Sequence, residues 1–193
     1  MFLRAHWKVL AASDFLTVEG WTGRALVTYY LLFVIGLAGR KVQVAGITRR
    51  PDEAWMLQVA RNLIDADTGA LPAKRYLIID RDTKYTQRCR KLIESSGTEV
   101  IRLPPLSPNL NAYAERFVRS IEDECLDRMI FVGQASLRHA VDEYMAHYHG
   151  ERNHQGLENR LLMETSTLAA NRGVVQRRRR LGGILKFHYR NPA

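Results

Sequence analysis

Cysteine is scarce in this sequence, and its scarcity excludes two kinds of cross-linked protein. Only Cys89 and Cys125 occur among 193 residues. A disulfide framework or a structural zinc site needs several ligands at short paired spacings, and these two cysteines are far apart. Both fall on predicted helices, so we expect buried thiols in a reducing compartment.

The sequence also lacks a segment that would take it into or across a membrane. Arg4, His6 and Lys8 interrupt the apolar residues at the N-terminus, which excludes the unbroken core of a secretory signal. The apolar run at residues 25–38 is shorter than the roughly 20 residues that cross a bilayer. We therefore expect a cytoplasmic protein with no membrane partner.

Acidic residues are absent from the C-terminal segment. From Arg172 onward the chain has seven basic residues and no Asp or Glu. The formal net charge is +9, so residues 1–171 carry only 9 minus 7, or +2. The positive charge indicates phosphate backbones or an acidic partner, with a solvated tail as the alternative. We expect a folded core at residues 1–170 and a basic tail at residues 171–193.

The apolar pattern of the core predicts an α/β fold. Three strands joined in antiparallel order precede an alternation of helices and strands, which predicts a five-stranded mixed sheet flanked by helices. Helix periodicity is strongest after the proline-rich loop at residues 104–108. In chain order we predict strands at 7–18, 25–35 and 41–48, a helix after residue 53, a strand at 74–80, a helix at 83–96, a strand at 98–103, and helices at 110–125 and 137–148.

Three acidic residues stand in contexts that suit a divalent cation. Asp14 lies in an apolar strand, Asp80 ends another, and Glu115 lies beside the apolar stripe of a helix. A carboxylate in apolar surroundings is costly unless it is paired. Oxygen ligands of this kind hold Mg²⁺ or Mn²⁺, and a pair of such ions can align the attacking and leaving oxygens of a phosphodiester.

Three motifs resemble those of bacterial insertion-sequence transposases. Residues 80–85, Asp-Arg-Asp-Thr-Lys-Tyr, resemble the family's Asp-Arg-Gly-Ser-Gln-Tyr element. Residues 111–117, Asn-Ala-Tyr-Ala-Glu-Arg-Phe, resemble its Asn-Ala-x-x-Glu-x-Phe element, and residues 148–157 resemble Tyr-x-x-x-Arg-x-His-x-x-Leu. The 35 positions from Asp80 to Glu115 also suit the acidic triad of retroviral integrases.

This resemblance covers roughly residues 7–160 and implies a retroviral-integrase-like core with the ribonuclease H-like fold. Members of the family cut DNA strands and join 3′ ends to target DNA with bound magnesium. By the resemblance, Asp14, Asp80 and Glu115 would be the catalytic metal ligands, with Mg²⁺ (or Mn²⁺) as cofactor. The chain would then be a polynucleotidyl transferase, a DDE transposase or integrase acting in DNA integration, recombination and transposition of a mobile element.

Each acid has an alternative interpretation. Asp14 could be only a strand-end residue, with Glu19 nearby. Asp80 could cap the following helix while Asp82 is the ligand, but Asp82 stands where the family usually has glycine, so we predict Asp82 as the cap. Glu115 could be a solvated helix acid, although its spacing and flanking motif argue against this.

Six further residues are predicted to contact DNA. Asn109 and Asn111 either position DNA or cap a helix. Arg116 and Arg119 either contact phosphates or pair with Glu122 or Asp123. Arg81 and Lys84 flank the second acid, Asp80.

Two other basic regions have structural alternatives. For Arg152 and His154 we favour a role in docking the last core helix over a role in catalysis. Arg177 to Arg180, with the aromatic and basic residues at 187–190, form either a nucleic-acid contact or a disordered extension.

Family members usually recognise their own DNA ends through an N-terminal helix-turn-helix region, whereas the first strand is predicted here almost at Met1. We therefore expect a separate core, a chain that works with a DNA-recognition subunit, or a decayed gene copy; the intact triad argues against advanced decay. The resemblance also implies a nucleoid-associated homodimer or larger nucleoprotein assembly on DNA. The alternatives are a non-catalytic DNA-binding or assembly module that keeps the integrase fold, and a ribonuclease H-like nuclease that cuts without joining.

Overall fold

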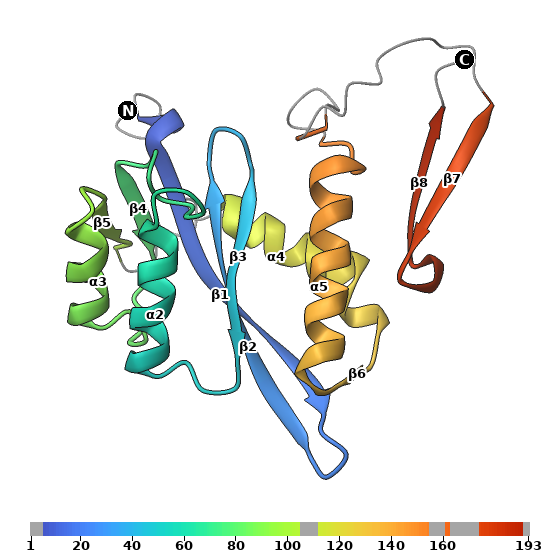
Figure 1. Ribbon diagram of the computed structural model, residues 1–193, viewed down its shortest axis with the longest axis horizontal. Helices are drawn as coiled ribbons and strands as arrows, with labels where there is room; N and C mark the ends of the chain where they lie inside the picture. The colour runs from blue at the N-terminus through green and yellow to red at the C-terminus, as the bar shows by residue number, and fades with distance from the viewer. Residues whose placement is uncertain (1–5, 105–111, 155–160, 163–173, 191–193) are drawn as a thin grey trace. The chain divides into compact units, whose positions relative to one another are not determined.

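The computed structural model of the chain divides into two compact units, Met1–Val118 and Arg119–Ala193 (Figure 1). The boundary falls inside helix α4 (Ala112–Glu124). The predicted boundary at residue 170 lies outside the described residues and stays a prediction. The structure describes residues 6–104, 112–154, 161–162 and 174–190.

A mixed sheet forms the centre of the first unit. Its strands are β1 (Leu10–Trp21), β2 (Leu26–Gly36), β3 (Val42–Thr48), β4 (Tyr76–Ile79) and β5 (Glu99–Arg102). They lie in the order β3-β2-β1-β4-β5. The β1–β2 and β2–β3 pairs are antiparallel, while β4 pairs in parallel with both β1 and β5. The mixed sheet expected from the sequence is therefore confirmed.

One face of this sheet packs against two helices, α2 (Glu53–Ile64) and α3 (Gln87–Glu94) (Figure 1). The strands contribute alternate residues to this core because successive side chains point to opposite faces. From β1 and β4 these are Ala11, Leu77 and Ile79, and the helices add apolar side chains that are almost fully buried. The core residues from the helices are Met56, Val59, Ala60, Leu63, Cys89 and Ile93.

The opposite face of the sheet receives the first turns of α4. The ring of Phe33, in β2, lies 4.7 Å from the ring of Phe117, in α4, and both are almost fully buried. Tyr113 of the same helix contacts Trp7 edge to face, with ring centroids 5.2 Å apart. Helix α4 therefore lies on the face opposite to α2 and α3.

The second unit contains α5 (Gly133–Gly150), the short strand β6 (Phe131–Val132) and a hairpin of β7 (Val175–Arg180) and β8 (Leu185–Arg190). The hairpin turn includes Gly182 and Gly183, whose φ angles of 65° and 99° lie in the left-handed region that glycine adopts at little cost. The arginine run is thus part of a strand, and the interpretation as a disordered extension does not apply to residues 174–190.

Both cysteines are free and buried, as expected, and burial raises the pKa of each thiol to about 11. Within the described part of the chain, no helix is long and apolar enough to span a membrane.

The first strand begins later than predicted. Residues Trp7–Val9 form a 3-10 turn, closed by the Val9 amide donating to the His6 carbonyl at 3.0 Å. The strand then runs to Trp21, beyond the predicted end at residue 18, because its ladder with β2 continues to the Trp21–Leu26 pair.

The predicted cap of the helix at residues 83–96 is wrong. Helix α3 begins at Gln87, and the Thr86 hydroxyl accepts from the Cys89 amide at 3.3 Å. Asp82 does not cap it, because its carboxylate accepts from the Lys84 amide and pairs with the Lys84 ammonium. Two local partners thus hold Asp82 in the turn before the helix.

Replacing Thr86 with alanine tests this cap. We expect Thr86→Ala to lower the free energy of unfolding by about 1 kcal/mol, because the Cys89 amide loses its acceptor. Thr83→Ala is the control, since Thr83 is exposed at the predicted start of the helix and should change stability by less than about 0.5 kcal/mol. Urea unfolding measures the stability of both variants. Equal losses of stability would contradict Thr86 as the N-cap of α3.

Candidate active site

Parallel pairing of β1 with β4 places two of the predicted acids side by side. Ser13 is in register with Ile79, so the next residue of β1, Asp14, is level with Asp80, directly after β4. Level residues of neighbouring strands project from the same face of a sheet. Both side chains are half-buried. The two carboxylates therefore share one face of the sheet at the end of β4.

Local hydrogen bonds orient both carboxylates. Asp80 Oδ1 accepts from the Asp82 amide at 3.0 Å, in the turn that leaves β4. Asp14 Oδ1 accepts from the Phe15 amide at 2.8 Å. The backbone therefore helps to fix the position of each carboxylate.

Helix α4, which carries the third predicted acid, packs on the same face through Phe117. Phe33 is the cross-strand neighbour of Asp14, so the two side chains lie on one face of the sheet. Phe117 packs on Phe33, and Glu115 stands two residues before it, half-buried in the first turn of α4. Asp14, Asp80 and α4 thus belong to the same side of the first unit.

The three acids do not form one ligand cluster. Among the residues that the structure describes, no group of three or more His, Cys, Asp or Glu side chains is placed to hold a metal ion. Asp14 and Asp80 form a pair of oxygen donors of the type that Mg²⁺ and Mn²⁺ prefer. The roles of Asp14, Asp80 and Glu115 as metal ligands all stay predictions.

The hydroxyl of Tyr85 lies close to this pair. Ser13 Oγ donates to the Phe33 carbonyl at 2.9 Å and lies 2.8 Å from Tyr85 Oη. A serine hydroxyl has a single proton, so Tyr85 is the donor in the second bond. The bond joins β1 to the turn that follows β4.

The electrostatics of Tyr85 also show that both carboxylates are near. Burial raises the pKa of Tyr85 well above its usual range, the bond to Ser13 opposes this, and the charges of Asp14 and Asp80 raise it further. Tyr85 therefore remains a neutral donor. The sequence alone predicts no role for Tyr85, although it ends the motif at residues 80–85, five residues after Asp80.

Two of the predicted DNA contacts follow Asp80. Arg81 is exposed, and its Nε donates to the Leu103 carbonyl at 3.0 Å. The Lys84 ammonium, besides pairing with Asp82, lies 5.0 Å from the centre of the Phe15 ring. Both cations thus have partners within the first unit.

The other predicted contacts belong to α4 and the preceding loop. Arg116 and Arg119 are exposed, and neither forms an ion pair with Glu122 or Asp123 in the described part of the chain. Asn109 and Asn111 lie outside the described residues.

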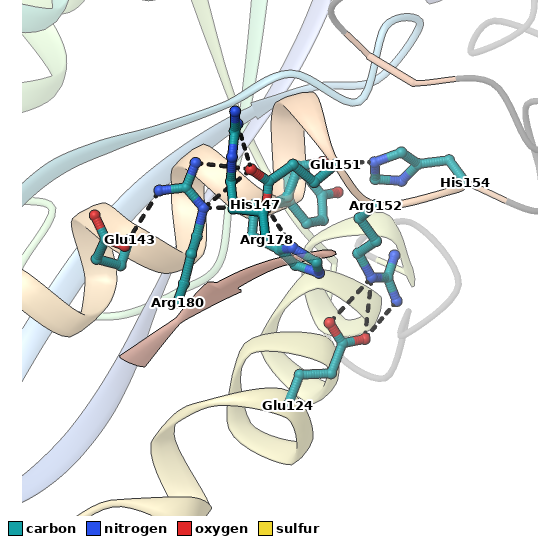
Figure 2. A network of polar contacts seen from close by, with 9 residues as sticks. Glu124, Glu143, His147, Glu151, Arg152, His154, Arg178 and Arg180 are labelled. Atoms are coloured by element: carbon teal, nitrogen blue, oxygen red, sulfur yellow. Dashed lines mark hydrogen bonds and ion pairs between the residues drawn. The ribbon is translucent and has the colours of Figure 1, made fainter. Parts of the chain in front are cut away.

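Arg152 and His154 have structural partners within the second unit (Figure 2). The Arg152 guanidinium binds the Glu124 carboxylate through Nε and Nη2, at 3.0 and 2.7 Å, and Nη2 also reaches Ser120 Oγ at 3.3 Å. His154 Nε2 donates to the Tyr148 carbonyl at 2.8 Å. These contacts join α4, α5 and the segment after α5, in agreement with a docking role.

Glu151 is the centre of a second group of ion pairs (Figure 2). Its carboxylate, nearly fully buried, accepts from Arg178 at 3.0 Å and Arg180 at 2.8 Å, and lies 3.1 Å from His147 Nδ1. Arg180 also donates to Glu143 at 3.1 Å. Glu151 thus joins the C-terminal end of α5 to β7.

The sequence alone predicts no role for Glu151. It occupies a variable position of the motif at residues 148–157, and its partners are 27 and 29 residues away. Burial acts to raise the pKa of Glu151, but hydrogen bonds from Arg180, His147 and Arg178 outweigh it and lower the pKa to about 2.

A double-mutant cycle on Ser13 and Tyr85 tests the bond beside the two acids. We expect Ser13→Ala and Tyr85→Phe each to lower the free energy of unfolding, with a coupling of about 1 kcal/mol between them, because both remove the same hydrogen bond. Thermal or urea unfolding of the four proteins measures it. A coupling near zero would mean that the bond does not form in solution.

The Glu151 network predicts a specific loss of stability in acid. The folded pKa of about 2 lies below the ordinary value of 4.5, so the ionised carboxylate stabilises the fold above about pH 4.5 and loses this effect as the pH falls towards 2. The wild type should therefore lose about 2 to 3 kcal/mol more than Glu151→Gln between about pH 6 and pH 2.5. Unfolding at both pH values measures this.

Asp142→Asn is the matched control, because Asp142 is an exposed carboxylate on α5, the helix that ends just before Glu151. It should follow the pH dependence of the wild type. A Glu151→Gln protein that loses as much stability in acid as the wild type would contradict the network.

Part of the chain matches a family model, and the chain is similar to solved structures. A family model described as "Integrase core domain" matches residues 96–161, a segment that includes Glu115 and Arg152 but not Asp14 or Asp80. No curated protein matches the chain in sequence.

Many solved structures are similar to this chain, and three of them are retroviral integrase structures. The catalytic core domain of BIV integrase has a TM-score of 0.50 and 14% identity, over 77% of this chain and 88% of that one. The HTLV-2 integrase catalytic core domain, a dimeric form in complex with magnesium, has a TM-score of 0.47 and 10% identity, over 74% and 86%. The simian T-cell lymphotropic virus intasome in complex with PP2A regulatory subunit B56 gamma has a TM-score of 0.40 and 10% identity, over 60% and 42%.

The similarity to the BIV structure concerns the fold, which agrees with the mixed sheet and its helices. The family model adds the segment that begins at β5 and runs through α4 and α5. The chain therefore has the ribonuclease H-like fold of retroviral integrase catalytic cores, and its residues 96–161 match the integrase core domain model.

Proposed function

We propose that this chain is the catalytic core of a metal-dependent DNA transposase or integrase, which cleaves DNA strands and transfers them to new positions. One observation carries the proposal. In an integrase-like domain, the β1–β4 register makes Asp14 level with Asp80 at the end of a buried parallel strand. Two carboxylates brought together in this way suit an oxygen-ligated divalent ion.

The proposed cofactor is Mg²⁺ or Mn²⁺, held by Asp14 and Asp80 with Glu115 as the third ligand. When bound, such ions lower the pKa of an attacking hydroxyl or water and stabilise the charge that develops on the phosphate. The Asp82 amide orients the Asp80 carboxylate for this role. Tyr85, which stays protonated, adds a hydrogen-bond donor to the turn without adding negative charge.

DNA is the proposed substrate, and a homodimer or larger nucleoprotein assembly is the proposed working form. Arg81, Lys84, Arg116 and Arg119 follow the second and third acids closely in sequence, which supports contacts with the DNA backbone near the site. Asn109 and Asn111 complete the proposed set. A separate subunit that recognises the DNA sequence is part of the same proposal.

A second candidate function is a non-catalytic DNA-binding or assembly module with the same fold. The observation that favours it is the absence of a three-ligand group among the described residues. Such a module would bind DNA through its basic surfaces and would not need its carboxylates.

Strand nicking and joining on labelled duplex DNA separate the two candidates. With Mg²⁺ or Mn²⁺ we expect activity that falls by at least about 100-fold in Asp80→Asn and in Glu115→Gln, because each removes a ligand that supports several kcal/mol of charge stabilisation. Asp123→Asn is the control for α4, since Asp123 is exposed on the same helix, and should retain activity.

Asp82→Asn tests the alternative ligand. It should keep most of the activity, since the Asp82 carboxylate already pairs with the Lys84 ammonium. If Asp82→Asn lost activity and Asp80→Asn retained it, Asp82 rather than Asp80 would be the metal ligand. A wild type that shifts DNA in a gel but never cuts it with either metal would favour the non-catalytic module.

A further inference from the structure

The register of the β7–β8 hairpin divides its side chains between two faces with different environments. Residues level with one another in an antiparallel pair project from the same face, and successive residues alternate. We call the two sets the helix-side face and the basic face. The helix-side face carries Gln176, Arg178, Arg180, Leu185, Phe187 and Tyr189, and the basic face carries Val175, Arg177, Arg179, Lys186, His188 and Arg190.

The helix-side face holds the hairpin to α5. Leu185 is buried, and both arginines on this face donate to the buried Glu151 (Figure 2). The side chain of Arg180 is only 19% exposed, because it also pairs with Glu143. The charges of this face are therefore compensated within the second unit.

The basic face has the opposite character. All six of its residues are exposed, and no Asp or Glu occurs anywhere in residues 174–190. Arg177 is level with His188, and Arg179 is level with Lys186. Like charges opposite each other in a sheet destabilise it, so the Arg179–Lys186 pair has a cost that a polyanion would remove.

The geometry of this face suits a regular row of phosphates. Arg177 and Arg179 are two positions apart on one strand, which separates their Cα atoms by roughly 6.8 Å. Lys186 extends the row onto the neighbouring strand. A two-stranded ribbon also has the width that the major groove of B-form DNA admits.

We propose that the basic face of the β7–β8 hairpin binds the phosphate backbone of duplex DNA, while Glu151 keeps the opposite face on α5. The choice of duplex DNA as the partner rests on the proposed function. The surface itself contains none of the three acids, so it adds a DNA contact in the second unit to those proposed beside the acids.

The test measures binding apart from cleavage. Fluorescence anisotropy of a labelled duplex, in EDTA and across a salt series, gives the Kd and the slope of log K against log salt. We expect Arg177→Gln/Arg179→Gln to weaken binding by about ten-fold or more at about 0.1 M salt, and to reduce the slope by about 1.8, since two phosphate contacts are lost. Arg177→Lys/Arg179→Lys should retain most of the slope, because the charges remain.

Arg49→Gln/Arg50→Gln is the matched control. It removes two positive charges from exposed residues of the first unit, so its net charge equals that of the hairpin variant. It should bind nearly as tightly as the wild type. Circular dichroism and the Tm show whether each variant keeps its fold. An unfolded hairpin variant is replaced by Lys186→Gln on the other strand of the same face, with Arg49→Gln as its charge-matched control.

The possible results separate this surface from the active site. A hairpin variant that binds with the Kd and slope of the Arg49/Arg50 control would overturn the proposal, and so would tighter binding of single-stranded DNA or duplex RNA through the same residues. A wild type that binds duplex DNA through the basic face in EDTA but does not cut it with Mg²⁺ or Mn²⁺ would overturn the proposed function alone.

Discussion

The arrangement of the first unit depends on the pairing of one short buried strand. All four residues of β4 are buried, and the strand pairs in parallel with β1 on one side and β5 on the other. Its short length means that the chain leaves the sheet at Asp80, level with Asp14. The same ladder therefore completes the core and places two like charges next to each other.

The two faces of the sheet divide the tasks of the first unit. Helices α2 and α3 cover one face with a continuous apolar core, which includes the ring of Tyr85. The hydroxyl of Tyr85 reaches Ser13 at the strand that carries Asp14. The carboxylates and α4 lie on the other side. A hydrogen bond from the apolar core thus supports the backbone from which a charged side chain projects.

Most elements followed from local patterns. The predicted ends of strands β2 and β3 and of helix α4 are within two residues of the observed ends. Apolar periodicity and turn residues depend only on neighbouring positions in the sequence, so they can be recognised there. The cap of α3 was predicted wrongly, because Asp and Thr are both common N-cap residues. Asp82 pairs with Lys84, and Thr86 caps the helix. The buried position of Glu151 depends on arginines 27 and 29 residues away, which no local pattern reveals. The three acids were found through spacing and motifs, and the β1–β4 register then gave two of them a shared position.

The run of four arginines in β7 has a consequence for how the hairpin folds. Moving a strand by one residue exchanges its two faces, and here the exchange would put Arg177 and Arg179 where Arg178 and Arg180 now stand. Since all four side chains are identical, the run does not encode its own alignment. Leu185 is buried on the helix-side face, and the turn with Gly182 and Gly183 determines which residues of the two strands are paired. The alignment of the most charged strand is therefore decided by an apolar residue and two glycines, and lengthening this turn by one residue would let the arginines change places.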